Sequence, residues 1–470
     1  MKRALCRARD SRPTIPRGIG RRGQQIGGVI AIAVAACSSP RPTATPTPVA
    51  ACVIGATQSG AGDTLTLAIM TPVDWSHVPE PANAAERLAF AQLYETLIDV
   101  DCDGHASPAL AASWTLDATK TRITLSLRHD AMFWSGKPLT ANDVLAAWQR
   151  SAALSTSSIR LAREIVSGTT VIDDHTLIVS LPDTSWMVLA SPALSIYEQQ
   201  ATARWAEGSG PYRIAEQAAP GVFLLMPIAS QSAPYLRSAP APSGDPRDAI
   251  DAGSDLLVTN DPMALAYAVA RPDLEAVPLP WTRTYALAIP GAAPTIASAL
   301  LGPDSVSGAL RASLAHEAVR AQARAAQPPY WWDGSPTCAS TPDSLSAARG
   351  ASGRSNRVVY RRDDAIARGL AERLVAFDSH SIASGLSPND FARVLRGGGE
   401  LAYVLDVPRA SWSPCDDLRE LRSSAPWLIA GVGAHAQLLP LIDTRETAII
   451  NRNRVSATVD WSGTLHFSRP

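Results

Sequence analysis

The chain has 470 residues, of which 46% are apolar and 18% charged, with a formal net charge of −1. This composition excludes a largely disordered chain, and the length exceeds one ordinary core, so two or three domains are expected. Residues 1–36 hold eight basic residues and one acidic residue, which leaves the remainder at about −8. A mildly acidic body without a basic face gives no reason to expect a nucleic-acid partner.

The basic leader precedes an apolar run, IGGVIAIAVAA. A helix of this length reaches about 16 Å, which is too short for a hydrocarbon core of about 30 Å. We therefore interpret 1–36 as a signal peptide. The run ends in Val-Ala-Ala-Cys37, which resembles the bacterial lipobox and implies a lipid-bearing Cys37 as the first mature residue. The alternative is a plain signal peptide cut at the same place. The Pro/Thr-rich stretch 37–52 predicts an extended linker between membrane and body.

Four further cysteines follow the lipobox: Cys52, Cys102, Cys338 and Cys415. Export places them where disulfides form, and four cysteines allow three connectivities. We expect the pairs Cys52–Cys102 and Cys338–Cys415, each within one half of the chain, with free thiols as the alternative. Their spacings do not fit a zinc site, so neither a metal nor a cofactor is expected.

The first half alternates strand and helix signals. We expect a strand at 62–70, a helix that runs to about Leu97, and a turn at 101–104. A strand at 121–128, a helix at 141–152 and a strand at 175–181 follow, and a glycine turn at 208–214 leads into another strand. Thr140 and Asp143 have capping-box spacing at the start of the second helix.

The second half continues the alternation. The expected elements are a helix and strand within 248–259, a strand within 274–289, a helix at 307–326, a loop at 327–357, a strand at 356–360, helices at 365–377 and 389–398, a buried strand at 400–407, and paired strands after 445. Mixed helices and strands over this length predict an α/β (mixed α+β) protein with more than one lobe.

The sequence has no recognised catalytic motif. The string Glu207-Gly-Ser-Gly210 lacks the first glycine of a nucleophile elbow, and we expect a tight turn there. His316-Glu317 lacks the second histidine of a zincin helix, and neither a Walker loop nor G-x-G-x-x-G occurs. We therefore do not expect an enzyme.

Several stretches together resemble one family: LYETLIDVDCDGHASPALAASWTLD, TRITLSLRHDAMFWSGKPLTANDVLAAWQR, GSGPYRI, DAIDAGSDLLVT and LRASLAHEAVR. In this order they are similar to the bacterial extracellular solute-binding proteins of family 5, the oligopeptide-, dipeptide- and nickel-binding group. The motif positions are Gly104, Pro108, Leu110, Ala111, Ser113, Trp114, Leu127, Arg128, Phe133, Gly136, Pro138, Thr140, Ala141, Asp143 and Val144. We interpret Phe133, Gly136, Pro138, Thr140 and Asp143 as turn, cap and packing positions.

The resemblance implies a two-lobed periplasmic-binding-protein fold of type II, with an extra subdomain and a ligand cleft between the lobes. Lobe I would comprise 53–85, 205–285 and 436–470, subdomain II 86–204, and lobe II 286–435. The implied function is that of a substrate-binding lipoprotein of an ABC-type importer. It would be a monomer that captures a small solute, peptide or peptide-like, and delivers it to a membrane permease.

The implied location is the cell envelope, either periplasmic or on the outer face of the cytoplasmic membrane. The alternative function is an interaction or structural protein of the envelope that keeps the fold without a ligand. A hydrolase that uses the cleft has no motif in its favour.

Peptide binders of this family place an Asp after the strand that resembles 400–407. A gapless register puts Arg409 at that position, where its guanidinium would suit a carboxylate or phosphate. A shift of three residues lets Asp406 serve instead, and a surface arginine is the third alternative. The expected ligand-binding residues are Trp75, His77, Asn260, Asp261, Trp281, Asp406, Arg409 and Trp412.

Overall fold

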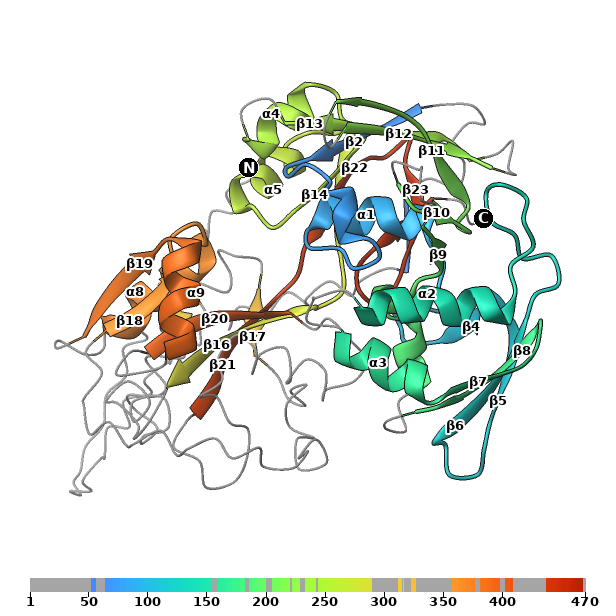
Figure 1. The fold of residues 1–470 in the computed structure, drawn as a ribbon. Coiled ribbons are helices and arrows are strands. Elements are labelled where there is room, and N and C mark those ends of the chain that lie inside the picture. The colour runs from blue at the N-terminus through green and yellow to red at the C-terminus, as the bar shows by residue number, and fades with distance from the viewer. Residues whose placement is uncertain are drawn as a thin grey trace, which may run out of the picture. The chain divides into compact units, whose positions relative to one another are not determined.

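A computed structural model describes residues 52–55, 64–153, 159–181, 186–199, 205–219, 222–228, 233–241, 244–289, 312–314, 316, 323–326, 357–376, 381–397, 402–408 and 437–467. All of them lie in the second of two compact units, Pro48–Pro470. The expected signal peptide and Cys37 lie outside the described residues. Helices and mixed sheets make up the described chain, which confirms the predicted α/β class (Figure 1). Within these ranges, no helix has the length and apolar character needed to cross a membrane.

The first large sheet has seven strands, and its central strand β2 runs parallel to β13 and β14 on either side. Side chains alternate along β2, so Leu65 and Leu67 join the core beneath α1, whereas Ala68 faces α4 and α5. The order is β11 (Tyr212–Ala219), β12 (Val222–Pro227), β13 (Tyr235–Pro240), β2 (Thr64–Ile69), β14 (Leu256–Thr259), β22 (Thr447–Asn451) and β15 (Leu274–Pro278). The helices are α1 (Ala84–Leu93), α4 (Pro246–Asp251) and α5 (Pro262–Val269).

Helix α1 ends at Leu93, earlier than the expected Leu97. Tyr94 is already extended, with φ −128° and ψ 122°. The backbone beyond it pairs elsewhere: Ile196 N donates to Glu95 O at 2.7 Å, and Gly210 N donates to Leu93 O at 2.9 Å. Bonds to neighbouring segments therefore replace the last turn of the helix.

A four-stranded antiparallel sheet carries two helices and belongs to the same core cluster. Its order is β5 (Ala111–Leu116), β6 (Arg122–Leu127), β8 (Thr176–Ser180) and β7 (Thr169–Asp173), with α2 (Ala141–Ala153) and α3 (Ile159–Ser167). The expected capping box at α2 is confirmed: Asp143 Oδ2 accepts from Thr140 N at 2.9 Å, and Asp143 N donates to Thr140 Oγ1 at 3.4 Å. Trp148 is fully buried and donates to Leu194 O at 2.8 Å.

The second large sheet has six strands and a helix on each face. Its order is β17 (Arg324–Ala325), β21 (Gln437–Thr444), β16 (Arg283–Ile289), β20 (Ala402–Pro408), β18 (Arg357–Arg361) and β19 (Ile382–Leu386). Alternation along β16 sends Tyr285 and Leu287 to α8 (Ala365–Val375), and Ala286 and Ala288 to α9 (Pro388–Gly397). Arg324–Ala325 form a strand where the expected helix at 307–326 would end.

The chain is expected to return to lobe I at residue 436, but the strand that begins at Gln437 pairs with the six-stranded sheet. β21 pairs with β16 over Gln437–Thr444, and the chain re-enters the seven-stranded sheet only at Thr447. The reason is that Leu441 and Ile442 of β21 fill the core beneath α8. Only Arg445 and Glu446 separate β21 from β22, so two nearly continuous strands connect the two sheets.

Smaller elements complete the described chain. They are β1 (Val53–Gly55), β23 (Ser456–Val459) and β24 (Leu465–His466) in one sheet, the pairs β3 (Ile98–Val100) with β4 (Ala106–Pro108) and β9 (Tyr197–Glu198) with β10 (Glu207–Gly208), and the 3-10 helices η1 (Trp75–His77), η2 (Trp186–Ala190) and η3 (Pro192–Leu194).

Candidate functional site: an aromatic cavity and a charged connector

A cavity of about 780 Å³ lies along one face of α1. Arg87, Phe90, Ala91 and Tyr94 line it, and their spacing of three and four residues puts them on one side of the helix. The turn at 130–136 and the C-terminal loop at 460–466 contribute further wall. The volume lies in the range of small-molecule binding sites, about 300–1,000 Å³.

Two glycines bring backbone close enough to α1 to build the cavity wall. A Cβ added at Gly208 would meet Leu93 O at 2.0 Å, and one at Gly210 would meet Gln92 O at 2.5 Å. The close approach lets Trp134 N donate to Gly208 O at 3.1 Å and Trp134 Nε1 donate to Gly210 O at 3.3 Å. The tight turn expected at 207–210 thus anchors an indole in the wall.

The anchored indole lies against Tyr94, with ring centroids 6.1 Å apart and planes 29° apart. Tyr94 is buried and donates its hydroxyl to Ala206 O at 3.2 Å. Burial, with a smaller contribution from Tyr197, raises the pKa of Tyr94 far above its usual value, so this phenol stays neutral. The pair therefore presents an uncharged aromatic surface.

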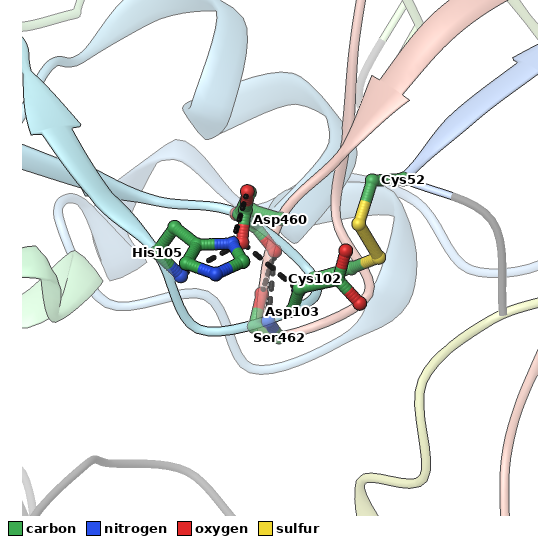
Figure 2. The surroundings of a disulfide bond; sticks show 7 residues. Cys52, Cys102, Asp103, His105, Asp460 and Ser462 are labelled. Carbon is green, nitrogen blue, oxygen red and sulfur yellow. Dashed lines mark hydrogen bonds and ion pairs between the residues drawn. A yellow bond between two sulfur atoms is a disulfide. The ribbon is translucent and has the colours of Figure 1, made fainter.

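The C-terminal wall is fixed by a turn and by a disulfide. Asp460 Oδ1 accepts from Ser462 N at 2.8 Å and from Thr464 N at 2.9 Å, while Trp461 N donates to Val100 O at 3.2 Å. Cys52 and Cys102 are joined by a disulfide close to this turn (Figure 2). Cys338 and Cys415 lie outside the described residues.

Asp101, Asp103 and His105 beside the disulfide place potential metal-ligand atoms within 4.8 Å of one another. Asp101 Oδ1 already accepts from Asp103 N at 2.9 Å and from His105 N at 2.8 Å, which closes the turn expected at 101–104. The turn explains this arrangement without an ion.

A second group of polar residues, the connector cluster, lies where the two sheets are joined. It has two parts: Arg324, Asp443 and Arg445 gather at Trp281, and Arg283 forms a separate pair with Asp406. The indole lies between two guanidinium groups, with its ring centroid 4.6 Å from Arg324 Cζ and 4.2 Å from Arg445 Cζ. Arg324 Nε contacts Asp443 Oδ2 at 3.1 Å. Burial, followed by repulsion from Arg324, lowers the pKa of Arg445.

Asp406 pairs with Arg283 across β16 and β20. Its second oxygen, Oδ1, is buried and has no hydrogen-bond partner among the described residues. Burial raises the pKa of Asp406, and the Arg283 charge opposes that rise. Of the predicted ligand residues, Trp281 thus lies with Arg324 and Arg445, whereas Asp406 lies in the separate pair with Arg283.

The predicted ligand residues of η1, Trp75 and His77, make packing and polar contacts within the protein. Trp75 lies against Phe90 and Phe223, with centroids 5.9 Å from each. His77 Nδ1 is 3.0 Å from Glu86 Oε1, and buried Glu86 also accepts from Ala82 N at 2.6 Å. Neither Trp75 nor His77 lines the cavity, although Pro79 and Pro81 of the same loop do.

The remaining predicted ligand residues do not join the cavity either. Asp261 caps α5 by accepting from Met263 N at 2.7 Å and Ala264 N at 2.9 Å, and Asn260 precedes it. Neither lines the cavity. Arg409 and Trp412 lie outside the described residues.

The cavity residues that sequence reasoning missed include Tyr94, Trp134 and Trp461. Tyr94 belongs to the motif stretch LYETL, and Trp134 belongs to MFWSGKP, in which Phe133, Gly136 and Pro138 are interpreted as turn and packing positions. Phe133 is indeed buried, Gly136 has φ +86° in its turn, and Asp143 caps α2. The same turn nevertheless places Trp134 in the wall, so scaffold and wall share one stretch.

Comparison with known proteins first identifies the class. The fold resembles a dipeptide-binding protein from Pseudoalteromonas sp. SM9913 in complex with Met-Leu, with TM-score 0.58, 14% identity, and coverage of 86% of this chain and 98% of that chain. NikA from Brucella suis in complex with Fe(III)-EDTA has a TM-score of 0.57 and 15% identity, and the match covers 86% of this chain and 98% of that chain. Haemophilus influenzae OppA complexed with RPPGFSPFR has a TM-score of 0.54 and 13% identity, and the match covers 88% of this chain and 100% of that chain. The chain therefore has the fold of two-lobed periplasmic binding proteins.

The sequence then narrows the class. Residues 105–222 match the model "Bacterial extracellular solute-binding proteins, family 5 Middle". A segment is 37% identical over 109 residues to the periplasmic oligopeptide-binding protein OppA of Escherichia coli (strain K12), covering 19% of this chain and 20% of that protein. OppA of Salmonella typhimurium is 29% identical over 136 residues, which cover 24% of this chain and 25% of that protein. The matches thus span at most a quarter of these relatives. Residues 105–222 thus resemble family 5, and the fold over most of the chain resembles that of two-lobed periplasmic binding proteins.

Proposed function

We propose that this protein is the substrate-binding component of an ABC-type importer, which captures a small solute and delivers it to a permease. The observation that carries the proposal is the aromatic cavity of about 780 Å³ in a fold that covers nearly the whole of several ligand-bound binding proteins. Those proteins hold a dipeptide and a longer peptide, so a peptide or peptide-like solute is the first class to test. No catalytic step is proposed.

The two connections between the sheets support a hinge-closing mechanism. Two short segments connect the large sheets: residues 279–282 between β15 and β16, and Arg445–Glu446 between β21 and β22. Hinge motions in binding proteins are absorbed by a few residues at the ends of elements. The connector cluster would then change its contacts as the two sheets move, whereas the residues that line the cavity along α1 all lie outside the six-stranded sheet.

We also propose that the protein is exported, becomes lipid-anchored through Cys37, and acts as a monomer in the cell envelope. The Pro/Thr-rich stretch 37–52 would tether the body to the membrane. Membrane fractionation of the full chain and of Cys37→Ser tests the anchor. Loss of the variant from the membrane fraction is expected, and retention would contradict lipidation at this cysteine.

Ligand-dependent thermal stabilisation of the mature protein tests the receptor function. A solute at a thousandfold excess over its Kd stabilises the folded state by about 4 kcal/mol. We expect a raised Tm with some member of a library of peptides, glycosides and small acids, and native mass spectrometry identifies any solute that co-purifies. An unchanged Tm throughout, with no bound solute, favours the alternative of a ligand-free envelope protein.

A matched pair of variants links that stabilisation to the cavity. Ala91→Phe adds a ring within the cavity wall, and Ala266→Phe adds the same ring at an exposed position of α5. The first variant should abolish the shift in Tm, and the second should retain it. Equal shifts in both would show that the solute binds elsewhere.

A further inference from the structure

We infer that the cavity along α1 takes an uncharged solute that presents an aromatic or broad apolar group together with carbonyl or hydroxyl oxygens. The inference rests on the proposed function, because it narrows the peptide-like solutes proposed for the same cavity to those without charged termini or side chains. Three features of the wall support it: its charges, its rings and its hydrogen-bond donors.

The charged side chains of the wall already have partners within the protein. Arg87 Nη2 is 2.6 Å from Glu446 Oε2, and His466 Nε2 is 3.1 Å from Asp460 Oδ2. Arg128 lies between two carboxylates, 3.8 Å from Glu95 and 3.9 Å from Asp130. An ionic group on the solute would lose its hydration and would also compete with these pairs.

The net negative charge of the side chains that line the cavity disfavours an anion in particular. Four acidic residues line the cavity against two arginines, and the fourth acid, Asp99, also has an interaction partner. A carboxylate would therefore enter a region where negative charge is in excess. A cation at Glu95, Asp130 or Asp460 would compete with the guanidinium or imidazole that already contacts that carboxylate. An uncharged solute meets neither cost.

The uncharged part of the wall is aromatic. Phe90, Tyr94, Trp134 and Trp461 contribute rings, and Pro79, Pro81, Pro192 and Pro211 contribute rigid apolar surface. Aromatic rings favour offset-stacked or edge-to-face contacts with another ring. This surface fits a solute with a ring or a comparable apolar group.

Two buried polar atoms of the wall residues form no hydrogen bond within the described parts of the chain, although one of them, Arg128 Nε, is 3.9 Å from Asp130 Oδ1 in an ion pair. Arg128 Nε and Ser209 Oγ are buried and form no hydrogen bond among the described residues. Both are donors, and the serine hydroxyl turns with a single χ1 rotation. Buried donors without partners are costly, so a solute that brings carbonyl or hydroxyl oxygens to them gains an advantage. The Ser209 hydroxyl, which is uncharged and forms no hydrogen bond with any residue that the structure describes, thus favours a solute with an acceptor oxygen.

Three phenylalanine derivatives of different charge test the inference on the mature protein. N-acetylphenylalaninamide is neutral, N-acetylphenylalanine is an anion and phenylalaninamide is a cation. Saturation-transfer NMR and calorimetry should show binding of the neutral analogue at least about tenfold tighter than either ion. Preference for an ion overturns the inference. So does failure of the neutral analogue when the solute library still raises Tm, whereas a library without any effect overturns the proposed function as well.

Two variants place the neutral analogue in this cavity. Ser209→Ala removes a hydroxyl that has no partner, so the Tm without ligand should stay the same or rise, whereas affinity should fall about three- to tenfold, as expected for one hydrogen bond. Ala91→Phe should abolish binding and Ala266→Phe should leave it unchanged. Unchanged affinity in both Ser209→Ala and Ala91→Phe overturns the assignment to this cavity.

Discussion

The cavity wall and the connector cluster deal with buried polar groups in different ways. The wall combines neutral rings with charged groups that are paired at its edges, and its precision comes from the close packing of Gly208 and Gly210 against α1. The connector cluster instead places arginines against carboxylates and around Trp281. Steric changes should therefore damage the wall most, and changes of charge should damage the connector most.

The largest effect is expected from Gly208→Ala. The added Cβ would meet Leu93 O at 2.0 Å, and a backbone oxygen cannot move aside cheaply. We expect the free energy of unfolding to fall by about 3 kcal/mol, measured by urea denaturation. The control is Gly397→Ala, where no atom lies within 4 Å of the added Cβ, and its stability should be equal or slightly higher. Equal stability of the two variants would show that the backbone around Gly208 shifts at little cost to admit a Cβ.

Sequence reasoning predicted the elements better than it predicted the wall. Alternation and helical spacing placed β2, β6, α2 and α8 because each signal is local to its own segment. The wall brings together Tyr94, Trp134 and Trp461, which are far apart in the sequence. Their convergence depends on how α1, a turn and a C-terminal loop pack, and no local pattern encodes that.

The same distinction explains the predicted ligand residues. Asp406 is a candidate because a shifted register aligns it with the Asp of the family's peptide binders, and in the structure its carboxylate pairs with Arg283. His77 and Asp261 are candidates because each follows a predicted strand, but His77 pairs with Glu86 and Asp261 caps α5. A polar residue at the end of an element serves a helix cap or a turn as readily as a ligand, and the sequence does not distinguish the two uses.

An intermediate effect is expected from breaking the connector pair. Arg283→Met leaves the carboxylate of Asp406 without its partner, and removal of one member of a buried pair costs about 3–5 kcal/mol. The Arg283 and Asp406 side chains are 30% and 21% exposed, so we expect a smaller loss of about 2 kcal/mol in urea denaturation.

Two further variants sharpen the result for this pair. Asp406→Asn added to Arg283→Met should recover part of the loss, because the unpaired charge is then gone. Arg368→Met breaks the exposed pair with Glu372 on α8 and should cost about 0.5 kcal/mol or less. If Arg283→Met cost no more than Arg368→Met, the connector would not depend on charge pairing.

The smallest effect is expected from Asp143 in the capping box, and it depends on pH. Burial alone would raise the pKa of Asp143, but hydrogen bonds from Lys137 and Thr140 outweigh burial and lower it. A carboxyl whose pKa is lower in the folded state contributes stability above its unfolded pKa, about 3.9, and loses it as pH falls through the folded pKa. Asp143→Asn should therefore cost about 1 kcal/mol at pH 7, and this difference from the wild type should shrink towards pH 2. Asp130→Asn, at a side chain that is 84% exposed, should change the free energy of unfolding little at either pH. A loss in Asp143→Asn that stayed constant with pH would assign the effect to packing instead of charge.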